Sequence, residues 1–321
     1  MGISRVLIAN RGEIAVRVIR ACRSLNLETV VVVSEADRAT LAAQLADRAV
    51  CIGPAPATKS YLVIESLIAA AQGTGCDALH PGYGFLAESA ALAQACLENG
   101  IVFVGPSPDS IQSMGNKLEA RETVRRFGVP TVPGSKNAES IKDAAIAASE
   151  VGYPILLKAA AGGGGKGIKI VHDQKDLTVA FETAVAEARA AFGDGTVYVE
   201  RYIPNARHIE VQVLGDGVGD ALHLGERDCS LQRRYQKIVE EAPAHGIPQA
   251  LKEGLWASAA TIAKEINYSG AGTVEYIYDQ DREEYFFLEM NTRIQVEHPV
   301  TETITGTDLV AQQLRIAAGE G

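Results

Sequence analysis

The stretch Phe287-Leu-Glu-Met-Asn-Thr-Arg-Ile-Gln-Val-Glu-His298 is the most informative segment of this chain. Side chains of an extended chain alternate between two faces, so a strand here would carry polar groups on one face and mainly apolar groups on the other. The polar positions are Glu289, Asn291, Arg293, Gln295 and Glu297. An ordinary half-buried strand with a solvated polar face shows the same alternation, so the neighbouring segments have to decide between a functional site and a plain surface strand.

A hairpin is predicted around this stretch. The preceding segment, Gly272-Thr-Val-Glu-Tyr-Ile-Tyr278, is rich in β-branched and aromatic residues, which favour a strand. The polar run Gln280-Asp-Arg-Glu-Glu284 is typical of a hairpin loop. If that whole run is unpaired, Glu275 falls opposite Glu289.

Two opposed carboxylates predict a cation site. Like charges directly opposite each other destabilise a sheet, and neighbouring carboxylates raise each other's pKa. A bound divalent cation removes both effects. With the amide oxygen of Asn291, Glu275 and Glu289 form a hard oxygen set, which suits magnesium bound together with substrate phosphates. Arg293 and Glu297 would then be an anion holder and a candidate base.

Composition excludes several classes of protein. The 321 residues carry a net charge of −10, which argues against a general nucleic-acid surface, and their 47% apolar content is that of a globular protein. No apolar run reaches the roughly 18 residues of a membrane span, and no signal peptide is recognisable, so a cytoplasmic protein is predicted. The five cysteines show no metal-like spacing and are predicted to be reduced thiols; a catalytic role for Cys229 is the less favoured interpretation.

The first hundred residues alternate strand and helix patterns. Apolar runs such as Arg5-Val-Leu-Ile-Ala9 and Glu28-Thr-Val-Val-Val-Val33 are typical of parallel strands covered on both faces. This pattern predicts an α/β domain with a doubly wound parallel sheet. Because Asn10-Arg-Gly-Glu13 stands where a G-x-G-x-x-G turn would follow the first strand, we expect no nicotinamide site.

The pattern changes after the first domain. The prolines at Pro130 and Pro133 indicate a boundary near residue 130. We expect four parts, at residues 1–112 (the doubly wound domain), 113–130 (connecting helices), 131–204 (a lid with a glycine-rich flap) and 205–321 (a catalytic domain).

A glycine-rich loop is predicted to fold over phosphates. The strand Pro154-Ile-Leu-Leu-Lys158 runs into Ala159-Ala-Ala-Gly-Gly-Gly-Gly-Lys-Gly-Ile-Lys-Ile-Val171. Glycines let backbone N–H groups close around an anion. No helix follows, as it would in a Walker A loop, and a second strand stands there instead. We therefore favour a hairpin lid over a plain surface hairpin.

Six motifs then occur in order along the chain. They are Ile8-Ala-Asn-Arg-Gly-Glu-Ile-Ala15, His80-Pro-Gly-Tyr-Gly-Phe-Leu86, Met114-Gly-Asn-Lys117, Lys158 with the glycine loop, Glu226-Arg-Asp-Cys-Ser-Leu-Gln-Arg-Arg-Tyr-Gln-Lys-Ile-Val-Glu-Glu-Ala-Pro243, and Glu289-Met-Asn-Thr-Arg-Ile-Gln-Val-Glu-His-Pro-Val-Thr301. Together they resemble the biotin carboxylase component of biotin-dependent carboxylases, within the ATP-grasp superfamily. The resemblance covers essentially the whole chain and implies an ATP-grasp fold after the first domain.

The resemblance also implies roles for individual residues. The ATP phosphates would be held by Lys117, Lys158, Lys237, Gly163, Gly164, Gly165, Lys166 and Gly167. Glu200, Tyr202, Ile203, His208, Gln232 and Gln236 would form the rest of the nucleotide pocket. Magnesium or manganese would be bound by Glu275, Glu289 and Asn291. Bicarbonate would lie against Arg293, Gln295, Val296 and Glu297, with Arg293, Lys237 and Glu297 as catalytic residues and Glu297 as the base, and Tyr83 would border biotin.

The implied activity is ATP-dependent carboxylation of biotin by bicarbonate, through carboxyphosphate. The implied partners are a biotin carboxyl carrier protein or domain, a carboxyltransferase subunit and, in the full-length form, a second copy of the chain. Tyr235 stands where the family has a smaller His or Asn. The family continues beyond residue 321, so we expect a shortened form. Two alternatives stay open: another ATP-grasp ligase that makes an acyl phosphate, such as carbamoyl phosphate synthetase, and a nucleotide-binding fragment without full turnover.

Overall fold

The computed structural model describes residues 2–135, 137–160, 167–234 and 236–320. Its N-terminal part is a five-stranded parallel sheet of order β3-β2-β1-β4-β5. The strands are β1 (Arg5–Ile8), β2 (Glu28–Ser34), β3 (Arg48–Gly53), β4 (Ala78–His80) and β5 (Val102–Phe103), and the helices are α1 (Gly12–Ser24), α2 (Leu41–Leu45), α3 (Ile64–Thr74) and α4 (Ala90–Glu98). The predicted doubly wound sheet is confirmed, and Val30 to Val33 are buried as a sheet covered on both faces requires.

Two helices and a small lid follow. The helices α5 (Pro108–Gly115) and α6 (Lys117–Arg126) lead into a three-stranded sheet of order β7-β6-β8. The lid consists of α7 (Ile141–Val151), β6 (Ile155–Ala159), β7 (Ile168–Val171), α8 (Leu177–Phe192) and β8 (Val197–Arg201). Because β6 and β7 pair antiparallel, the predicted strand–loop–strand flap is confirmed, although residues 161–166 at its tip lie outside the described residues.

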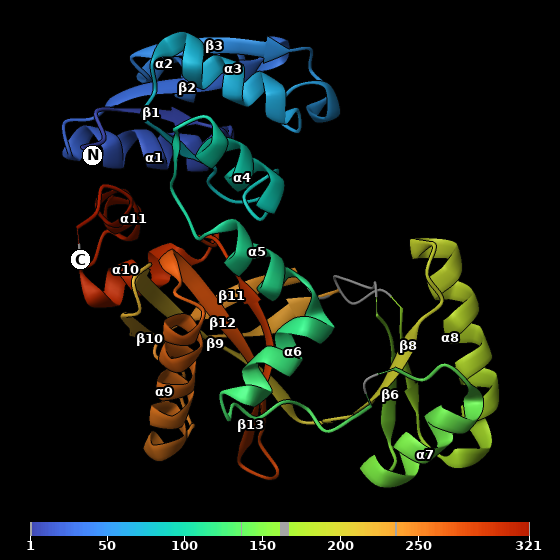
Figure 1. Ribbon diagram of the computed structural model, residues 1–321. Coiled ribbons are helices and arrows are strands. Elements are labelled where there is room, and N and C mark those ends of the chain that lie inside the picture. Colours follow the sequence, from blue (N-terminus) through green and yellow to red (C-terminus); the bar gives the residue numbers. More distant parts are fainter. Residues whose placement is uncertain (1, 136, 161–166, 235, 321) are drawn as a thin grey trace.

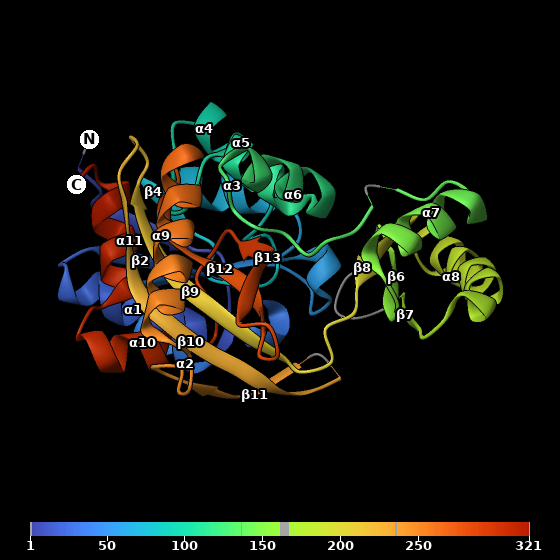
Figure 2. The same cartoon turned by 90° about the horizontal axis from the view of Figure 1, so that it is seen from below.

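The last part is an antiparallel sheet of order β11-β10-β9-β12-β13. Its strands are β9 (Ala206–Asp216), β10 (Ala221–Arg233), β11 (Gln236–Glu241), β12 (Ser269–Asp279) and β13 (Glu284–Asn291), with helices α9 (Gln249–Glu265), α10 (His298–Thr305) and α11 (Leu309–Ala317). The helix α9 covers one face over a core that includes Val211, Leu255 and Tyr276. The two sheets after residue 130, with the lid set to one side of the larger sheet, make up the expected ATP-grasp fold (Figures 1 and 2).

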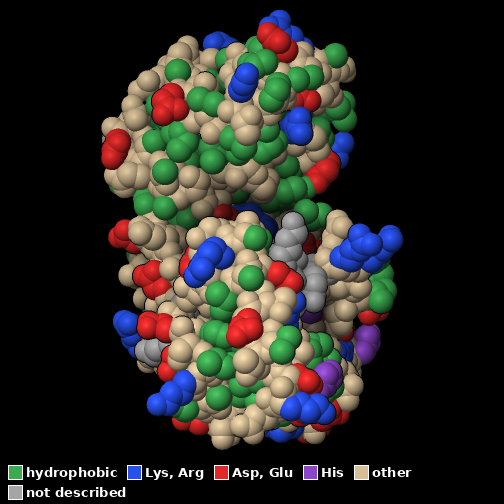
Figure 3. Space-filling model, turned by 90° about the vertical axis from the view of Figure 1, so that its right-hand side faces the viewer, with side chains coloured by type: hydrophobic (Ala, Val, Ile, Leu, Met, Phe, Trp, Pro, Cys, Tyr) green, Lys and Arg blue, Asp and Glu red, His purple; other side chains and the backbone are tan. Residues whose placement is uncertain are grey.

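The N-terminal domain packs against the end of the chain. Leu309, Val310 and Leu314 of α11 belong to the same buried cluster as Ile14 and Val18 of α1. Figure 1 accordingly shows α11 directly beneath α1, with α10 below α11. Seen from the lid side, the surface narrows between the N-terminal domain and the rest, and Lys and Arg side chains are interspersed with acidic ones (Figure 3). The predicted boundaries at residues 112, 130 and 204 remain predictions.

The predicted pairing of Glu275 with Glu289 is confirmed, but two departures from the expected hairpin compensate each other. Glu284 was expected in the loop and instead pairs with Asp279, which shortens the loop by one residue. A β-bulge between the Glu275 and Tyr276 pairs then adds one residue to β13 and restores the predicted register.

The strand is also shorter than expected. We predicted extended backbone as far as His298, whereas β13 ends at Asn291 and α10 begins at His298. Met290, Thr292 and Ile294 are buried as the alternation predicts, but the side chain of Val296 is 60% exposed. The alternation therefore persists to Ile294 and is lost only in the turn that leads into α10.

No helix within the described ranges is both long enough and apolar enough to cross a membrane. This finding agrees with the absence of a long apolar run in the sequence.

His80, at the end of β4, is expected to make the stability of this fold sensitive to acid. Its ring is fully buried, and its Nδ1 atom accepts a hydrogen bond of 3.0 Å from the backbone N–H of Gly82. Burial lowers the pKa of His80 to about 4. Between about pH 4 and pH 6.5 the unfolded chain therefore binds a proton that the folded chain does not, and stability is lost as pH falls through this window.

We expect the wild type to lose about 2 kcal/mol more unfolding free energy between pH 7.5 and pH 5 than the variant His80→Asn, whose side-chain oxygen can still accept the Gly82 N–H. Urea unfolding at the two pH values measures the difference. Equal losses in both proteins would show that His80 is protonated as easily in the folded chain as in the unfolded one.

Candidate active site

A cavity of about 830 Å³ lies between the lid sheet and the antiparallel sheet. It brings together most of the residues that the sequence singled out. These are Lys117, Lys158, Glu200, Tyr202, His208, Gln232, Gln236, Lys237, Glu275, Glu289, Asn291, Arg293, Gln295, Val296 and Glu297. They come from α6, β6, β8, β9, β10, β11, β12, β13 and the turn before α10, so residues far apart in the sequence converge on one space.

Lys237, on β11, is the centre of the charged end of this cavity. Its ammonium group lies 2.6 Å from a carboxylate oxygen of Glu297 and 2.9 Å from one of Glu275, and it also contacts Glu210. Burial by itself lowers the pKa of Lys237, but the three carboxylates outweigh this effect and hold the pKa well above its usual value. The lysine therefore stays a cation beside the predicted base.

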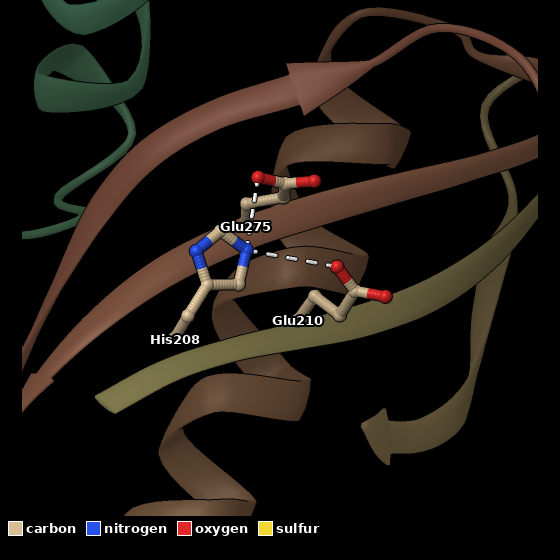
Figure 4. A group of neighbouring side chains, drawn as sticks. All are labelled: His208, Glu210 and Glu275. Atoms are coloured by element: carbon tan, nitrogen blue, oxygen red, sulfur yellow. Dashed lines mark ion pairs between the residues drawn. The ribbon is translucent and has the colours of Figure 1, made fainter. Parts of the chain in front are cut away.

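His208 completes this charged cluster (Figure 4). Its Nε2 atom lies 3.0 Å from Glu275 and 3.7 Å from Glu210, on the neighbouring strands β12 and β9. Burial would lower the pKa of the imidazole, but the two carboxylates raise it to about 9. The resemblance implied a place for His208 in the nucleotide pocket, and in the structure it lines the cavity and lies beside the predicted metal ligand Glu275.

The opposed pair Glu275 and Glu289 meets the chemical requirements of a magnesium site. Both carboxylates line the cavity from adjacent strands, and protein cations balance both of them, with Lys117 3.2 Å from Glu289 and Lys237 beside Glu275. The amide of Asn291 lies at the same place, donating to Glu275 over 2.7 Å. Two carboxylates and an amide form an oxygen-rich donor set of the kind that magnesium prefers.

The other end of the cavity belongs to the lid. Lys158, on β6, forms an ion pair with Glu200 on β8, and Arg121 of α6 binds the same carboxylate. Arg121 also donates to the carbonyl oxygen of Val132 over 2.7 Å. Sequence reasoning missed Arg121, because it lies among several other charged residues of a polar helix and only the fold brings it to Glu200.

Two further residues of this site were also missed. Glu88, in the N-terminal domain, accepts hydrogen bonds from the backbone N–H of Thr292 at 3.2 Å and from Nε of Arg293 at 3.1 Å. Arg227, on β10, is fully buried and contacts Glu210 and Gln295. Arg227 belongs to one of the six motifs, but the resemblance gave it no role. The sequence around Glu88 and around Arg227 gives no sign of these contacts, because the residues that they bind are remote in sequence.

Some predicted site residues lie elsewhere. Ile203 is buried with Val132 and Phe286 and does not line the cavity. Tyr83 packs against the core around α1, and its buried hydroxyl has no hydrogen-bond partner among the described residues. Gly167 directly precedes β7 and has a φ of 75°, a backbone conformation that favours glycine. The positions Gly163, Gly164, Gly165 and Lys166, and the divergent Tyr235, lie outside the described residues.

Cys229 is a structural thiol. It is fully buried beneath the charged cluster, and burial raises the pKa of its thiol well above the usual value. Cys51, by contrast, is exposed.

We expect iodoacetamide to label Cys51 in the folded protein and to label Cys229 at least roughly a hundredfold more slowly, as peptide mass spectrometry would measure. Equal labelling rates without denaturant would show that Cys229 is accessible and ionisable.

Comparison with known proteins shows the family of this chain. Residues 2–111 match the family model described as the N-terminal domain of biotin carboxylase, and residues 116–321 match the ATP-binding domain of the carbamoyl-phosphate synthase L chain. Over 318 residues the chain is 52% identical to biotin carboxylase 1 of Bacillus subtilis, covering 99% of this chain and 71% of that protein.

The chain belongs to the biotin carboxylase family.

Other members of the family match this chain over nearly its whole length. Biotin carboxylase of Pseudomonas aeruginosa is 53% identical over 320 residues, covering 99% of this chain and 71% of that protein. The crystal structure of the Campylobacter jejuni biotin carboxylase–β,γ-ATP complex superposes with a TM-score of 0.93 at 46% identity, covering 99% of this chain and 72% of that one.

One relative was solved with ligands of interest. The biotin carboxylase domain of Hydrogenobacter thermophilus 2-oxoglutarate carboxylase, solved with MgADP, ADP and bicarbonate, has a TM-score of 0.91 at 49% identity, covering all of this chain and 70% of that one. The match to a carbamoyl-phosphate synthase model reflects a shared ATP-binding domain, and the N-terminal match and the whole-chain relatives decide in favour of biotin carboxylase over that alternative.

Proposed function

We propose that the cavity uses ATP and magnesium to phosphorylate bicarbonate and then carboxylates biotin with the product. The observation that carries this proposal is the position of Glu297. Its carboxylate lies 2.6 Å from Lys237, and Arg293 and Gln295 line the same cavity. A base, a cation and two N–H donors thus surround one space, which suits a small oxyanion that must lose a proton.

The lid end of the cavity is suited to the nucleotide. Lys117 and Lys158 supply positive charge for phosphate oxygens, and Tyr202 adds an aromatic wall. Glu200 holds Lys158 and Arg121 and thereby links β6, β8 and α6 around the space. The flap formed by β6 and β7 would cover the phosphates, which would exclude water from a labile intermediate.

The divalent cation would be held by Glu275, Glu289 and Asn291. Its bonds would replace the ion pairs that Glu289 forms with Lys117 and that Glu275 forms with Lys237. The bound cation would neutralise charge on the ATP phosphates during the transfer. Its ligands come from adjacent strands, so the pleat of the sheet positions them without help from mobile loops.

The chemistry balances with these residues. An oxygen of bicarbonate attacks the γ-phosphorus, the bond to the β-phosphate oxygen breaks and ADP leaves, while Glu297 takes the bicarbonate proton. The resulting carboxyphosphate breaks into CO₂ and phosphate. Nitrogen N1 of biotin gives its proton to the released phosphate and forms a bond to CO₂. Arg293 lines the same cavity and donates hydrogen bonds of 3.1 and 3.0 Å to Glu88 and Asn291, and we propose it as the anion holder.

The partners and the location follow from this activity. We propose that biotin arrives on a carrier protein or domain, that a carboxyltransferase uses the carboxylated product, and that the protein is a homodimer in the cytoplasm. Tyr83 of the N-terminal domain, which does not line the cavity, remains our proposal for the border of the biotin site.

ADP release by this chain tests the proposal. With magnesium and ATP, we expect release to increase when bicarbonate and free biotin are added together. A chain that binds ATP but shows no stimulation by either compound would favour a nucleotide-binding fragment and contradict the proposed turnover.

A further inference from the structure

Arg227 is a charged side chain that the mechanism above does not use. It lies on β10 at 0% exposure, behind the wall of the cavity. A guanidinium group has five N–H donors in a fixed plane, and all five are used. The acceptors are Glu210 at 2.7 Å, Gln212 at 2.8 Å, Thr301 at 2.8 Å, Thr273 at 3.3 Å and Gln295 at 2.7 Å.

The contact with Gln295 determines which end of that amide faces the cavity. Arg227 has only donors, so the atom of Gln295 that it contacts must be the carbonyl oxygen Oε1. The amide nitrogen Nε2 is then turned toward Glu275, to which it donates over 2.9 Å. A side-chain amide nitrogen has two N–H groups, and within the described residues Nε2 makes no second hydrogen bond. One N–H donor therefore remains for a ligand in the cavity.

The backbone of Gln295 is held independently. Its carbonyl oxygen lies 2.7 Å from Nδ1 of His298, in the first turn of α10. With the main chain anchored by His298 and the side chain by Arg227, the amide keeps one orientation. A free glutamine would present carbonyl oxygen or N–H with similar ease, and the carbonyl oxygen would repel an anion.

We propose that Arg227 is a positioning residue for bicarbonate: it fixes the Gln295 amide so that an N–H group faces the anion. This inference rests on the proposed function, because it assigns bicarbonate to the space beside Gln295. Arg227 does not itself line the cavity, so it acts on the substrate only through its neighbour.

The competing explanation is that Arg227 serves the fold alone. It joins β9, β10, β12 and α10, and its charge compensates the buried carboxylate of Glu210. A purely structural arginine would affect stability and every kinetic parameter alike. A positioning arginine would act on bicarbonate and would need Gln295 to do so. The two explanations differ in whether the effects of changing Arg227 and Gln295 are independent.

The test compares Arg227→Lys, Gln295→Ala and the double variant. Lysine keeps the charge beside Glu210 but cannot reach five acceptors from one nitrogen. We expect Arg227→Lys to raise KM for bicarbonate about tenfold or more while KM for ATP stays within about twofold. In the Gln295→Ala background, the same Arg227→Lys change should add less than about twofold. Additive effects of the two changes, or equal increases in both KM values, would overturn the proposal.

Two further variants keep the test decisive. Thr301→Val removes another acceptor of Arg227 that does not touch the cavity, and we expect bicarbonate KM to change by less than about twofold.

If Arg227→Lys unfolds, Gln295→Glu takes its place, because it keeps an oxygen on Arg227 and replaces the N–H donor by an acceptor. Loss of bicarbonate stimulation with ATP binding intact supports the proposal, and retained stimulation overturns it. A wild type without bicarbonate stimulation would refute the proposed function itself.

Discussion

Replacing Glu297 by glutamine is expected to remove bicarbonate-stimulated ATP cleavage while leaving ATP affinity nearly unchanged. Glutamine keeps an oxygen for Lys237 but cannot accept the bicarbonate proton. Loss of a general base typically lowers a rate by roughly a hundredfold to ten-thousandfold. Lys117 and Lys158, to which we assign ATP contacts, pair with Glu289 and Glu200 and not with Glu297, so these contacts are untouched. Steady-state ADP release with and without bicarbonate, together with calorimetric titration of ATP, measures both quantities.

Glu265→Gln is the matched control for this prediction, since Glu265 is exposed at the end of α9 and does not line the cavity. It should behave as the wild type in both assays. If Glu297→Gln instead loses ATP binding to the same degree as turnover, Glu297 is part of the nucleotide site and the proposed division of roles is wrong.

The second large effect is expected for Glu289→Gln. Glu289 is a proposed cation ligand, and the amide retains the shape of the side chain but loses the charge. We expect the affinity for magnesium to fall about a hundredfold in the presence of ATP, with ATP cleavage falling in parallel at limiting magnesium. Stability should change by less than about 1 kcal/mol, because the side chain is 34% exposed and its ion pair with Lys117 lies near the surface.

The same strand provides a control for Glu289. Glu284 forms an ion pair of 3.1 Å with Arg201 at the far end of β13, outside the cavity. Glu284→Gln should leave the magnesium dependence of ATP cleavage unchanged. A wild-type magnesium titration for Glu289→Gln would exclude this carboxylate as a ligand.

Local patterns in the sequence were sufficient to predict the strands and the flap that carry the site residues. The polar residues that alternate after Phe287 all line the cavity as predicted, although Leu288 and Val296 from the other face line it too. The glycine run beside Lys158 predicted the flap. The pairing of Glu275 with Glu289 was also predicted, yet it arises from a shorter loop offset by a bulge. Neither departure has a clear signal in the sequence, since the loop contains no Asn-Gly or Asp-Gly pair that would define a two-residue turn.

Contacts between remote segments could not be predicted in this way. Arg121 meets Glu200, Glu88 meets Arg293, and Arg227 meets Gln295, each across 68 or more residues of sequence. Such contacts depend on how the sheets and helices pack. Charged residues in a polar helix or a strand look the same whether their partner is water or a distant carboxylate. The resemblance to a family supplied roles for cavity residues but did not identify these supporting partners.

The central claim is that ATP phosphorylates bicarbonate in this cavity. ATP cleavage in freshly dissolved ¹⁸O-labelled bicarbonate tests it most directly, because carboxyphosphate retains the attacking bicarbonate oxygen when it breaks into CO₂ and phosphate. The account predicts released phosphate that carries one ¹⁸O atom, and no labelling above background in the Glu297→Gln variant. Phosphate without ¹⁸O from the wild type, at an undiminished rate of ADP release, would mean that water attacks ATP and would contradict the account.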